Sequence, residues 1–274
     1  MFLVTGASGH IGGRVARLLA QRGAPVRRLM RQAGSTPDLP GSTVAIGDYG
    51  DRASLARAMD GVDTVFLASA GAPPLKRAAL HGNVMDVAAG AGVKRLVYLS
   101  FQGASATSPF PYSADHLLSE AHLKQSGLAW TILRDSFYQD LIPTLPDAEG
   151  VIRDPGGDGK VAWVARDDVA RTVAAVLLDD RHAGHSYDVT GPEALSLEEA
   201  VARLAAAKGG VPSYRRETLE EGRAWRAATG AAAWEVEVWL GSYLAMGTGE
   251  LARVSGAVRE ITGRDPVPLA KGRA

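Results

Sequence analysis

Short apolar runs and stretches with helical spacing alternate along the first two thirds of the chain. One helical stretch begins at Asp51, a side chain suited to cap a helix that continues to Met59. Alternation of this kind is typical of an α/β fold in which helices cover both faces of a doubly wound parallel sheet. The runs that we interpret as strands cover residues 2–5, 25–30, 43–46, 63–68, 94–100 and 129–134.

The pattern changes in the second half of the chain. Two short strands are expected around the turn Pro155–Gly159, followed by a helix from Arg166 and a last short strand over 186–190. From Ser196 onward the spacing is helical, beginning with a capping box that ends at Glu199. The predicted helices of this part lie near 197–207, 218–229, 233–246 and 249–262.

Three glycines, Gly6, Gly9 and Gly12, follow the first apolar run at three-residue spacing, and Ile11 and Val15 then recur at helical spacing. The first glycine allows a tight turn off the strand, the second lets the backbone approach a pyrophosphate, and the third lets the helix pack closely on the sheet. The phosphates would lie at the positive N-terminus of that helix. Strand, glycine turn and helix together predict a Rossmann-type dinucleotide-binding fold.

The second strand is expected to end at Arg31, and this end point bears on the form of the dinucleotide. An acidic side chain here binds the ribose hydroxyls of NAD, whereas an arginine accommodates the 2′-phosphate of NADP. The chain runs from Leu29 and Met30 into Arg31 and Gln32 without a carboxylate. NADP is therefore the expected cofactor, although an arginine that is only a solvated loop charge would give the same sequence.

The chain is expected to divide into two parts. Residues 1–135 form an NADP-binding Rossmann domain to which 160–190 return, and residues 136–159 and 191–274 form a smaller, mainly helical C-terminal substrate lobe. The lobe contains three closely spaced tryptophans, which could line an aromatic pocket but are more strongly expected to pack a small core. These are Trp225, Trp234 and Trp239.

Composition narrows the function further. The 274 residues include 30 basic and 30 acidic side chains, so no overall charge attracts nucleic acid or an anionic membrane. Cysteine is absent, which removes disulfides, thiolate catalysis and cysteine metal sites, and the histidines show no metal-ligand spacing, so no metal is expected. We find no targeting signal and no apolar run long enough to cross a bilayer. A cytoplasmic protein with a small-molecule substrate fits these observations.

Candidate catalytic residues follow the fifth strand. Ser100 ends that strand at the edge where ligands of doubly wound sheets bind. Tyr112 and His116 lie four residues apart at the start of the next helix, so they share one face. The three side chains could therefore converge beside a nicotinamide. Alternatively, Tyr112 is an ordinary aromatic residue at a helix start and His116 only supports its neighbours.

The order and spacing of these motifs resemble the NmrA-like branch of the atypical short-chain dehydrogenases, closest to the group of NADPH-dependent quinone oxidoreductases and triphenylmethane reductases. The resemblance covers essentially the whole chain. It is carried by Thr5–Gly12, Arg31, Gly47-Asp48, Ala91–Ser100, His116 with Glu120, Ser126–Arg134, Ala165–Ala170 and Ile261–Pro266.

The resemblance implies a role for each matching residue. The pyrophosphate would be held by Gly6, Ser8, Gly9, His10 and Ile11, and the 2′-phosphate by Arg31. Asp48 and Tyr49 would lie near the adenine, and Ala68, Ser69 and Ala70 would run under the adenosine. His116 stands where related reductases carry a lysine, four residues after a tyrosine. Because histidine titrates near neutrality and lysine does not, the usual proton relay of that family is uncertain in this chain.

The leading hypothesis is an NADPH-dependent reductase that transfers hydride to a quinone-like acceptor. A wall formed by Phe101, Phe137 and Tyr138 would bind the acceptor, and His116 or Tyr112 would place or protonate its oxygen. Two alternatives stay open, a catalytically inactive NADP(H)-binding redox sensor of the NmrA type and a biosynthetic reductase of a specific metabolite. The sequence also leaves a homodimer open.

Overall fold

The computed structural model describes residues 1–34, 36–208 and 213–269. The C-terminal lobe expected from the sequence includes 209–212 and 270–274, which lie outside the described residues. The chain forms two compact units. Unit 1 comprises residues 1–100, 115–134 and 167–187, and unit 2 comprises residues 101–114, 135–166 and 188–274.

A seven-stranded sheet runs through unit 1 in the order β3-β2-β1-β4-β5-β6-β9. The chain leaves the centre at β1 in one direction through β2 and β3 and then in the other through β4, β5 and β6, which is the order of a doubly wound fold. The pairs β1–β2, β2–β3, β1–β4 and β4–β5 are parallel. The predicted Rossmann-type α/β fold is confirmed. The strands are β1 (Phe2–Val4), β2 (Val26–Met30), β3 (Ser42–Ile46), β4 (Thr64–Leu67), β5 (Arg95–Phe101), β6 (Ala129–Asp135) and β9 (His185–Val189).

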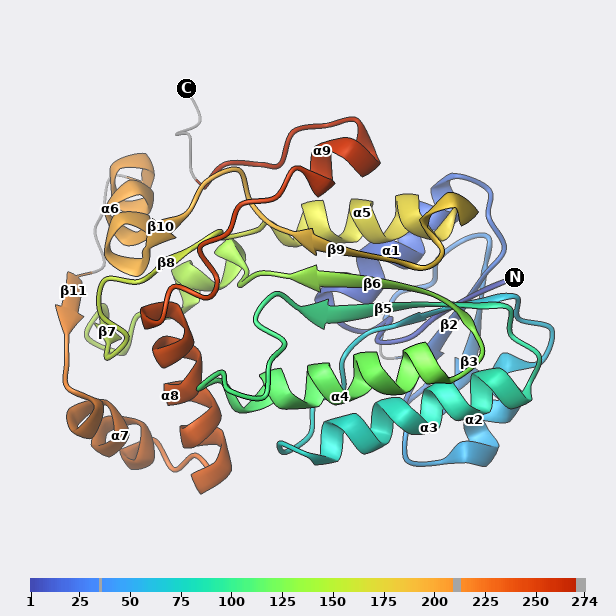
Figure 1. Ribbon diagram of the computed structural model, residues 1–274, viewed down its shortest axis with the longest axis horizontal. Helices are drawn as coiled ribbons and strands as arrows, with labels where there is room; N and C mark the ends of the chain where they lie inside the picture. The colour runs from blue at the N-terminus through green and yellow to red at the C-terminus, as the bar shows by residue number, and fades with distance from the viewer. Residues whose placement is uncertain (35, 209–212, 270–274) are drawn as a thin grey trace. The chain divides into compact units, whose positions relative to one another are not determined.

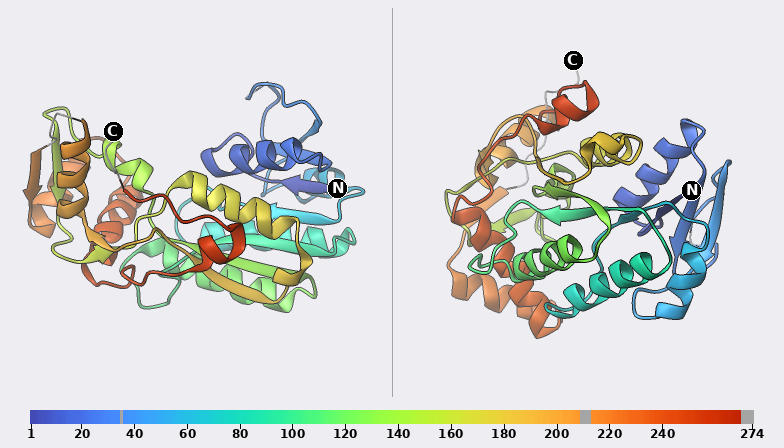
Figure 2. Two further views of the ribbon diagram at one scale, coloured as in Figure 1. Left: turned by 90° about the horizontal axis from the view of Figure 1, so that it is seen from above. Right: turned by 45° about the vertical axis from the view of Figure 1, so that its right-hand side comes forward.

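Helices cover both faces of this sheet. In Figures 1 and 2, α1 (His10–Gln21) and α5 (Arg166–Leu177) lie on one face, and α3 (Lys76–Gly90) and α4 (Pro111–Gln125) lie on the other. The short α2 (Arg52–Met59) packs against α3 and β3. Asp51 caps α2 as predicted, because its carboxylate accepts hydrogen bonds from the amides of Ala53 and Ser54.

Burial of the strands follows their place in the sheet. Every residue of β4 and β5 is buried, as expected for central strands covered on both faces. Most of β3 is exposed instead, because β3 is an edge strand and carries residues such as Ser42 and Thr43. The continuous apolar pattern therefore marks the centre of the sheet and not its edge.

Unit 2 is built mainly from helices and short strands. The two strands predicted around Pro155–Gly159 exist, but β7 pairs in parallel with β11 and β8 pairs antiparallel with β10. The predicted capping box is present, since the amide of Ser196 donates to Glu199 and the amide of Glu199 donates back to the Ser196 hydroxyl. The remaining elements of the chain, with η2 in unit 1, are η1 (Gln139–Thr144), β7 (Val151–Asp154), β8 (Lys160–Val161), η2 (Asp180–His182), β10 (Leu195–Ser196), α6 (Leu197–Lys208), β11 (Ser213–Arg216), α7 (Leu219–Ala228), α8 (Ala233–Gly247) and α9 (Ala257–Thr262).

The predicted helix over 249–262 is wrong for its first half, because only α9 is helical. Gly249 has a φ of +76°, a left-handed conformation that ends a helix. The segment after it forms a turn and then irregular coil, and the carbonyl of the fully buried Leu251 accepts a hydrogen bond from the amide of Ala162. The pattern also missed β11, whose residues alternate little between polar and apolar.

Two tryptophans of unit 2, Trp225 and Trp239, lie against a buried cation, whereas Trp163 packs in an apolar core. The guanidinium of Arg226, whose side chain is 1% exposed, lies 5.4 Å from the ring centre of Trp225, 5.1 Å from that of Trp239 and 4.7 Å from that of Tyr243. Trp234 is 37% exposed and stands apart from this cluster.

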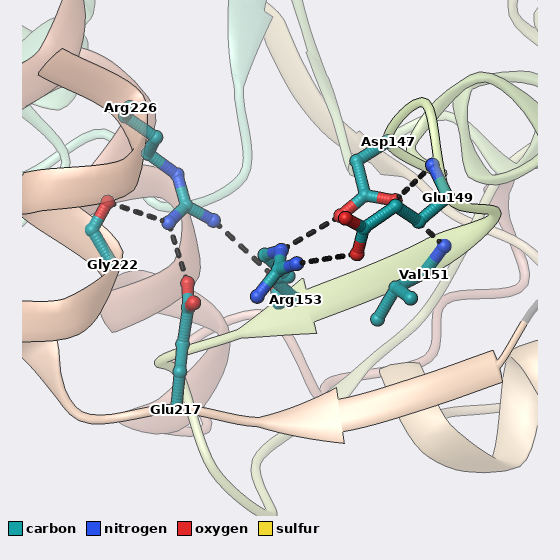
Figure 3. A network of polar contacts seen from close by, with 7 residues as sticks. All are labelled: Asp147, Glu149, Val151, Arg153, Glu217, Gly222 and Arg226. Carbon is teal, nitrogen blue, oxygen red and sulfur yellow. Dashed lines mark hydrogen bonds and ion pairs between the residues drawn. The ribbon is translucent and has the colours of Figure 1, made fainter. Parts of the chain in front are cut away.

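Charged partners complete the surroundings of this cation. Figure 3 shows its guanidinium directed at the carboxylate of Glu217, 2.6 Å away, and at the carbonyl oxygens of Gly222 and Arg153. The side chain of Arg153 in turn pairs with Asp147 at 2.7 Å. We call the residues Asp147, Glu149, Arg153, Glu217 and Arg226 the ionic network. Its internal pairing indicates a structural role in unit 2.

Candidate active site

The glycine turn in unit 1 has the geometry that its sequence suggested. Gly6 has a φ of +59°, which glycine adopts without strain, and its carbonyl accepts the amide of Gly9 at 2.8 Å. A Cβ on Gly12 would lie 2.3 Å from the carbonyl oxygen of Gly6 and 2.5 Å from that of Thr5. Only glycine therefore lets α1 approach the end of β1 this closely.

The N-terminus of α1 is suited to bind an anion. Its N-cap, Gly9, provides no side-chain hydrogen bond, and the first turn contains no acidic residue. Ser8, Gly9 and His10 are exposed at this turn, whereas Ile11 is buried beneath it. The amides at this end and the helix dipole favour a phosphate, so the residues present fit a dinucleotide.

Arg31 directly follows β2 and is exposed. Among the described residues it makes no ion pair, whereas the preceding arginine on the strand, Arg28, is buried and donates to the Thr36 hydroxyl and the Pro37 carbonyl. The structure thus places one arginine in a structural contact and leaves the other accessible at the end of the strand. Its binding of a 2′-phosphate stays a prediction.

Asp48 and Tyr49 brace the turn after β3. The Asp48 carboxylate accepts the amide of Gly50 at 2.7 Å. The Tyr49 hydroxyl lies 2.6 Å from the Thr5 hydroxyl and 2.9 Å from the Ala68 carbonyl, and Thr5 accepts the amide of Ala68 at 2.9 Å. Burial raises the pKa of Tyr49, so the phenol stays protonated. Tyr49 therefore ties together the ends of β1 and β4, where the switch point of the sheet lies.

Two hydrogen bonds to buried groups hold the loop that follows β4. The Ser69 hydroxyl donates to the carbonyl of Leu99 at 3.1 Å, and the amide of Ala70 donates to Nε2 of His81 at 2.9 Å. Ala68, Ser69 and Ala70 are each half-buried. His81 thus holds the loop that was predicted to run under the adenosine.

Ser100 is buried at the end of β5, and its hydroxyl donates to Oε1 of Glu120 at 2.7 Å. Arg134 holds the same carboxylate with two nitrogens, one of them 2.8 Å from Oε1. The charge of the buried Glu120 is therefore compensated. Since its proton is engaged with Glu120, Ser100 offers a substrate lone pairs rather than a proton.

His116 lies in a buried group of polar side chains between α3, α4 and β5. Its Nδ1 is 2.8 Å from the hydroxyl of Tyr98, which lies 3.2 Å from Nδ1 of His81. Burial is the main cause that lowers the pKa of His116 well below its usual range, and Arg77 adds to the effect. The same two causes lower the pKa of His81 to about 3. Both imidazoles are therefore neutral at physiological pH.

A strained residue marks the start of α3. Leu75 has a φ of +68°, a left-handed conformation that is costly for a side chain with a Cβ, and it is 69% exposed. The buried carboxylate of Asp115 accepts the amides of Leu75 and Ala78, both at 2.9 Å. A carboxylate on α4 therefore caps α3 and fixes the two helices that carry His81 and His116.

The remaining predicted site residues belong to unit 2, where Phe101, Tyr112 and Phe137 are part of an aromatic cluster. The ring of Phe101 lies 5.2 Å from that of Phe137 and 5.1 Å from that of Phe110, which lies 5.5 Å from Tyr112. The Tyr138 hydroxyl donates to the Asp135 carboxylate. That Tyr112 meets Ser100 and His116, and that Phe101, Phe137 and Tyr138 bind a substrate, stay predictions.

Several residues around His116 could not be singled out from the sequence. They lie on different elements and up to 49 positions apart, from Ala70 to Ser119. Tyr98 sits in a buried strand and resembles an ordinary core aromatic residue. The available signal in the sequence was a tyrosine, Tyr98, inside the apolar run 94–100 of a predicted strand, where a polar group needs a partner.

The chain matches the NAD(P)H-binding family over residues 6–180. It is 31% identical to the NAD(P)H azoreductase of Xenophilus azovorans over 269 residues, which cover 96% of this chain and 93% of the relative. A (4-alkanoyl-5-oxo-2,5-dihydrofuran-3-yl)methyl phosphate reductase of Streptomyces griseus is 35% identical over 280 residues, covering 98% and 95%. The crystal structure of the quinone oxidoreductase QOR2 of Escherichia coli, complexed with NADPH, superposes with a TM-score of 0.89 at 29% identity and covers 99% of this chain and 98% of that one.

These findings agree with the fold and with the glycine turn. None of the helices among the described residues is long and apolar enough to cross a membrane. The resemblance stated from the sequence is confirmed. The chain belongs to the NAD(P)H-binding family, and it is an NAD(P)H-dependent oxidoreductase of the NmrA-like kind.

Proposed function

We propose that this protein is an NADPH-dependent reductase that transfers hydride to a quinone-like or other conjugated small-molecule acceptor. The observation that carries the proposal is the turn from β1 into α1, where a Cβ on Gly12 would meet backbone oxygen at 2.3 Å. This packing leaves the first turn of α1 open to a pyrophosphate. The relatives named for quinone and azo reduction support the class of acceptor.

NADPH is proposed over NADH because of Arg31. Its exposed guanidinium follows β2, and the sequence has no carboxylate at this strand end. Gly6, Ser8, Gly9, His10 and Ile11 would hold the pyrophosphate, while Asp48, Tyr49 and the loop Ala68–Ala70 would line the adenosine. The side chains of Asp48 and Tyr49 already hydrogen-bond to the backbone of Gly50 and Ala68, so they would shape the site by fixing that backbone.

NADPH, when bound, supplies the hydride. As a C–H bond of the reduced nicotinamide breaks, the hydride would form a new bond to hydrogen on the quinone, and one proton from water would complete the hydroquinone, leaving NADP⁺. The chain's task is to place the acceptor and stabilise the negative charge that develops on its oxygen. His116 is the proposed group for this contact, with Ser100 and Tyr112 as further candidates, and Phe101, Phe137 and Tyr138 would bind the flat ring.

A biosynthetic reductase is the second candidate, favoured by the relative from Streptomyces griseus. It keeps the cofactor and replaces the broad acceptor by one unsaturated metabolite. A redox sensor would bind the cofactor without turnover. We further propose that the protein works in the cytoplasm; a homodimer stays open.

Steady-state reduction of a panel of quinones, with NADPH and NADH run in parallel, tests the proposal. We expect oxidation of NADPH and little of NADH. Replacing Arg31→Ser should raise KM for NADPH about 10- to 100-fold, since a charged hydrogen bond contributes roughly 1.5–3 kcal/mol. KM for NADH should change little, and Arg22→Ser, at the exposed C-terminal end of α1, should leave both values unchanged.

The outcomes separate the candidates. NADPH binding without consumption by any acceptor would indicate a sensor. Consumption with one furanone-type substrate and with none of the quinones would favour the biosynthetic reductase. Equal KM values for both nucleotides in the natural protein would refute the role of Arg31.

A further inference from the structure

We propose that His81 and Tyr98 act as positioning residues that hold His116 as a neutral imidazole with its proton on Nε2. His81 and Tyr98 are fully buried, His116 is 6% exposed, and Ser119 beside them is 1% exposed. Buried polar groups of this kind satisfy their hydrogen bonds within the protein, so the direction of each bond can be worked out from its neighbours.

The first hydrogen bond, between Ala70 and His81, has its donor fixed by a backbone amide. The amide of Ala70 can only donate, and it lies 2.9 Å from Nε2 of His81. This nitrogen must therefore carry the lone pair, and a neutral His81 must carry its proton on Nδ1.

The second direction follows from the first. Nδ1–H of His81 lies 2.9 Å from the Ser119 hydroxyl oxygen and 3.2 Å from that of Tyr98, so both oxygens act as acceptors toward it. The proton of Ser119 goes to the carbonyl of Asp115 at 2.7 Å. Because Nδ1 of His81 has no lone pair to offer, the proton of Tyr98 must go elsewhere.

The third direction reaches His116. Its Nδ1 lies 2.8 Å from the Tyr98 hydroxyl, closer than Nδ1 of His81. The hydroxyls of Ser69 and Ser119 also contact Tyr98, but each donates its own proton to a backbone carbonyl. Tyr98 therefore donates, Nδ1 of His116 accepts, and the proton of a neutral His116 is on Nε2. The direction of the whole chain is set by the amide of Ala70, a residue of the loop proposed to run under the cofactor.

The surroundings keep both imidazoles uncharged. Arg77 is the cation that faces them, and it is buried on the same helix as His81. Two buried carboxylates lie on α4 close to His116 in sequence: Asp115 accepts the amides of Leu75 and Ala78, and Glu120 pairs with Arg134 and accepts the Ser100 hydroxyl. Burial and the neighbouring cation thus act in the same direction, against imidazolium.

This inference rests on the proposed function for its consequence. A neutral Nε2–H placed against the acceptor's oxygen donates a hydrogen bond as negative charge develops there, and it gives up no proton. The hydride supplies both electrons, and water supplies the proton. In this arrangement His116 acts at a pH where an ordinary histidine would be titrating.

Histidine-labelled protein and long-range ¹H–¹⁵N spectra test the inference without requiring turnover. The resonances of His116 are identified by their loss in His116→Ala. We expect the shifts of an Nε2–H tautomer for His116 and of an Nδ1–H tautomer for His81, with no protonation of either between about pH 6 and pH 8. An Nδ1–H tautomer or an imidazolium at His116 would overturn the proposal.

Two variants test whether Tyr98 sets the tautomer. Tyr98→Phe removes the donor, and we expect the His116 resonances to move to those of a mixed tautomer and kcat for quinone reduction to fall roughly tenfold. Ser119→Ala removes the nearer acceptor of His81 and leaves Tyr98 in place, so the tautomer of His116 should be unchanged. An unchanged His116 tautomer in Tyr98→Phe would contradict the positioning role. If that variant does not fold, the tautomers of the natural protein alone decide.

The readouts also separate this inference from the proposed function. If the natural protein reduces no quinone but shows the expected tautomers, the proposed function fails and the hydrogen-bond direction stands. If the natural protein reduces quinones while His116 is in the other tautomer, the proposed function stands and the inferred hydrogen-bond direction fails. Replacing His122→Ala, an exposed histidine that pairs with Asp86, should change neither the activity nor the His116 spectrum.

Discussion

Each of the two units buries a polar network. The polar groups are uncharged and hydrogen-bonded in one network and are paired as opposite charges in the other. In unit 1, His81, Tyr98 and His116 are joined by directional hydrogen bonds between uncharged groups. In the ionic network of unit 2, Arg226 and Glu217 keep their charges and neutralise each other at 2.6 Å while being 1% and 2% exposed.

The difference shows which network can serve chemistry. A buried ion pair resists change because each charge depends on its partner, and this suits a structural element that fixes β7 against α7. A chain of neutral groups can instead present a defined donor at its end at little electrostatic cost. His116 belongs to the network of unit 1, and we propose it for the active site.

Breaking the ionic network should have the largest effect. Arg226→Met would leave the carboxylate of Glu217 buried without its cation, and we expect a loss of about 3–5 kcal/mol in the free energy of unfolding. Urea denaturation measures it. The exposed pair Arg259–Asp265 provides the control, because Arg259→Ala should cost about 0–1 kcal/mol. Equal losses in both variants would mean that burial does not distinguish the two pairs.

Breaking the neutral network should cost less stability and more activity. Tyr98→Phe leaves Nδ1 of His116 without the Tyr98 donor, which should lower the free energy of unfolding by about 1–3 kcal/mol. Urea denaturation and quinone reduction, measured on the same preparation, give the two effects. A variant as unstable as Arg226→Met with normal turnover would show that this network is purely structural.

Lowering the pH should remove the stability contributed by the two networks over different pH ranges. The pKa of His81 falls from 6.5 to about 3 on folding, so the unfolded chain binds the proton first as pH decreases. The stability due to neutral His81 is complete above pH 6.5 and is lost as pH falls toward 3, by about 1.4 kcal/mol per pH unit. The amide of Val151, followed by Arg153, lowers the pKa of Asp147, so that contribution is lost only below about 3.8. Unfolding free energies at pH 7, 6 and 5 test this, and a flat profile would contradict it.

The smallest effect is expected at the edge of the neutral network. Ser119→Ala removes one acceptor of His81 and leaves Tyr98 as the other, so we expect a loss of roughly 0.5–1.5 kcal/mol in unfolding free energy. Comparing this loss with that in Tyr98→Phe shows which of the two hydrogen-bond partners of His81 contributes more stability. A larger loss in Ser119→Ala than in Tyr98→Phe would show that the shorter hydrogen bond of His81, to Ser119, contributes more stability than the bonds of Tyr98.

Local patterns in the sequence were enough for the fold and for the glycine turn. Gly6, Gly9 and Gly12 are close in sequence; Gly6 adopts a positive φ, and a Cβ on Gly9 or Gly12 would meet backbone oxygens within a few residues. The same is true of the caps at Asp51 and Ser196. The helix expected over 249–262 failed because a tertiary contact at Leu251 outweighed the local spacing.

The candidate site depends on contacts that no local pattern contains. His116 was a candidate from its spacing to Tyr112, but its burial and its bond to Tyr98 arise from packing of α4 on β5. The engagement of Ser100 with Glu120 likewise joins positions 20 apart. Such contacts decide the charge and the tautomer of His116, and they appear only once the chain is folded.

The most direct test of the account is a single turnover. NADPH-loaded protein is mixed with excess benzoquinone, and loss of the reduced nicotinamide is followed by absorbance in the natural protein and in His116→Ala. The account predicts complete oxidation in one fast phase, slowed roughly 100-fold in the variant, the lower range for a positioned group that acts in the transition state. NADPH that stays bound and reduced, or equal rates in the two proteins, would contradict it.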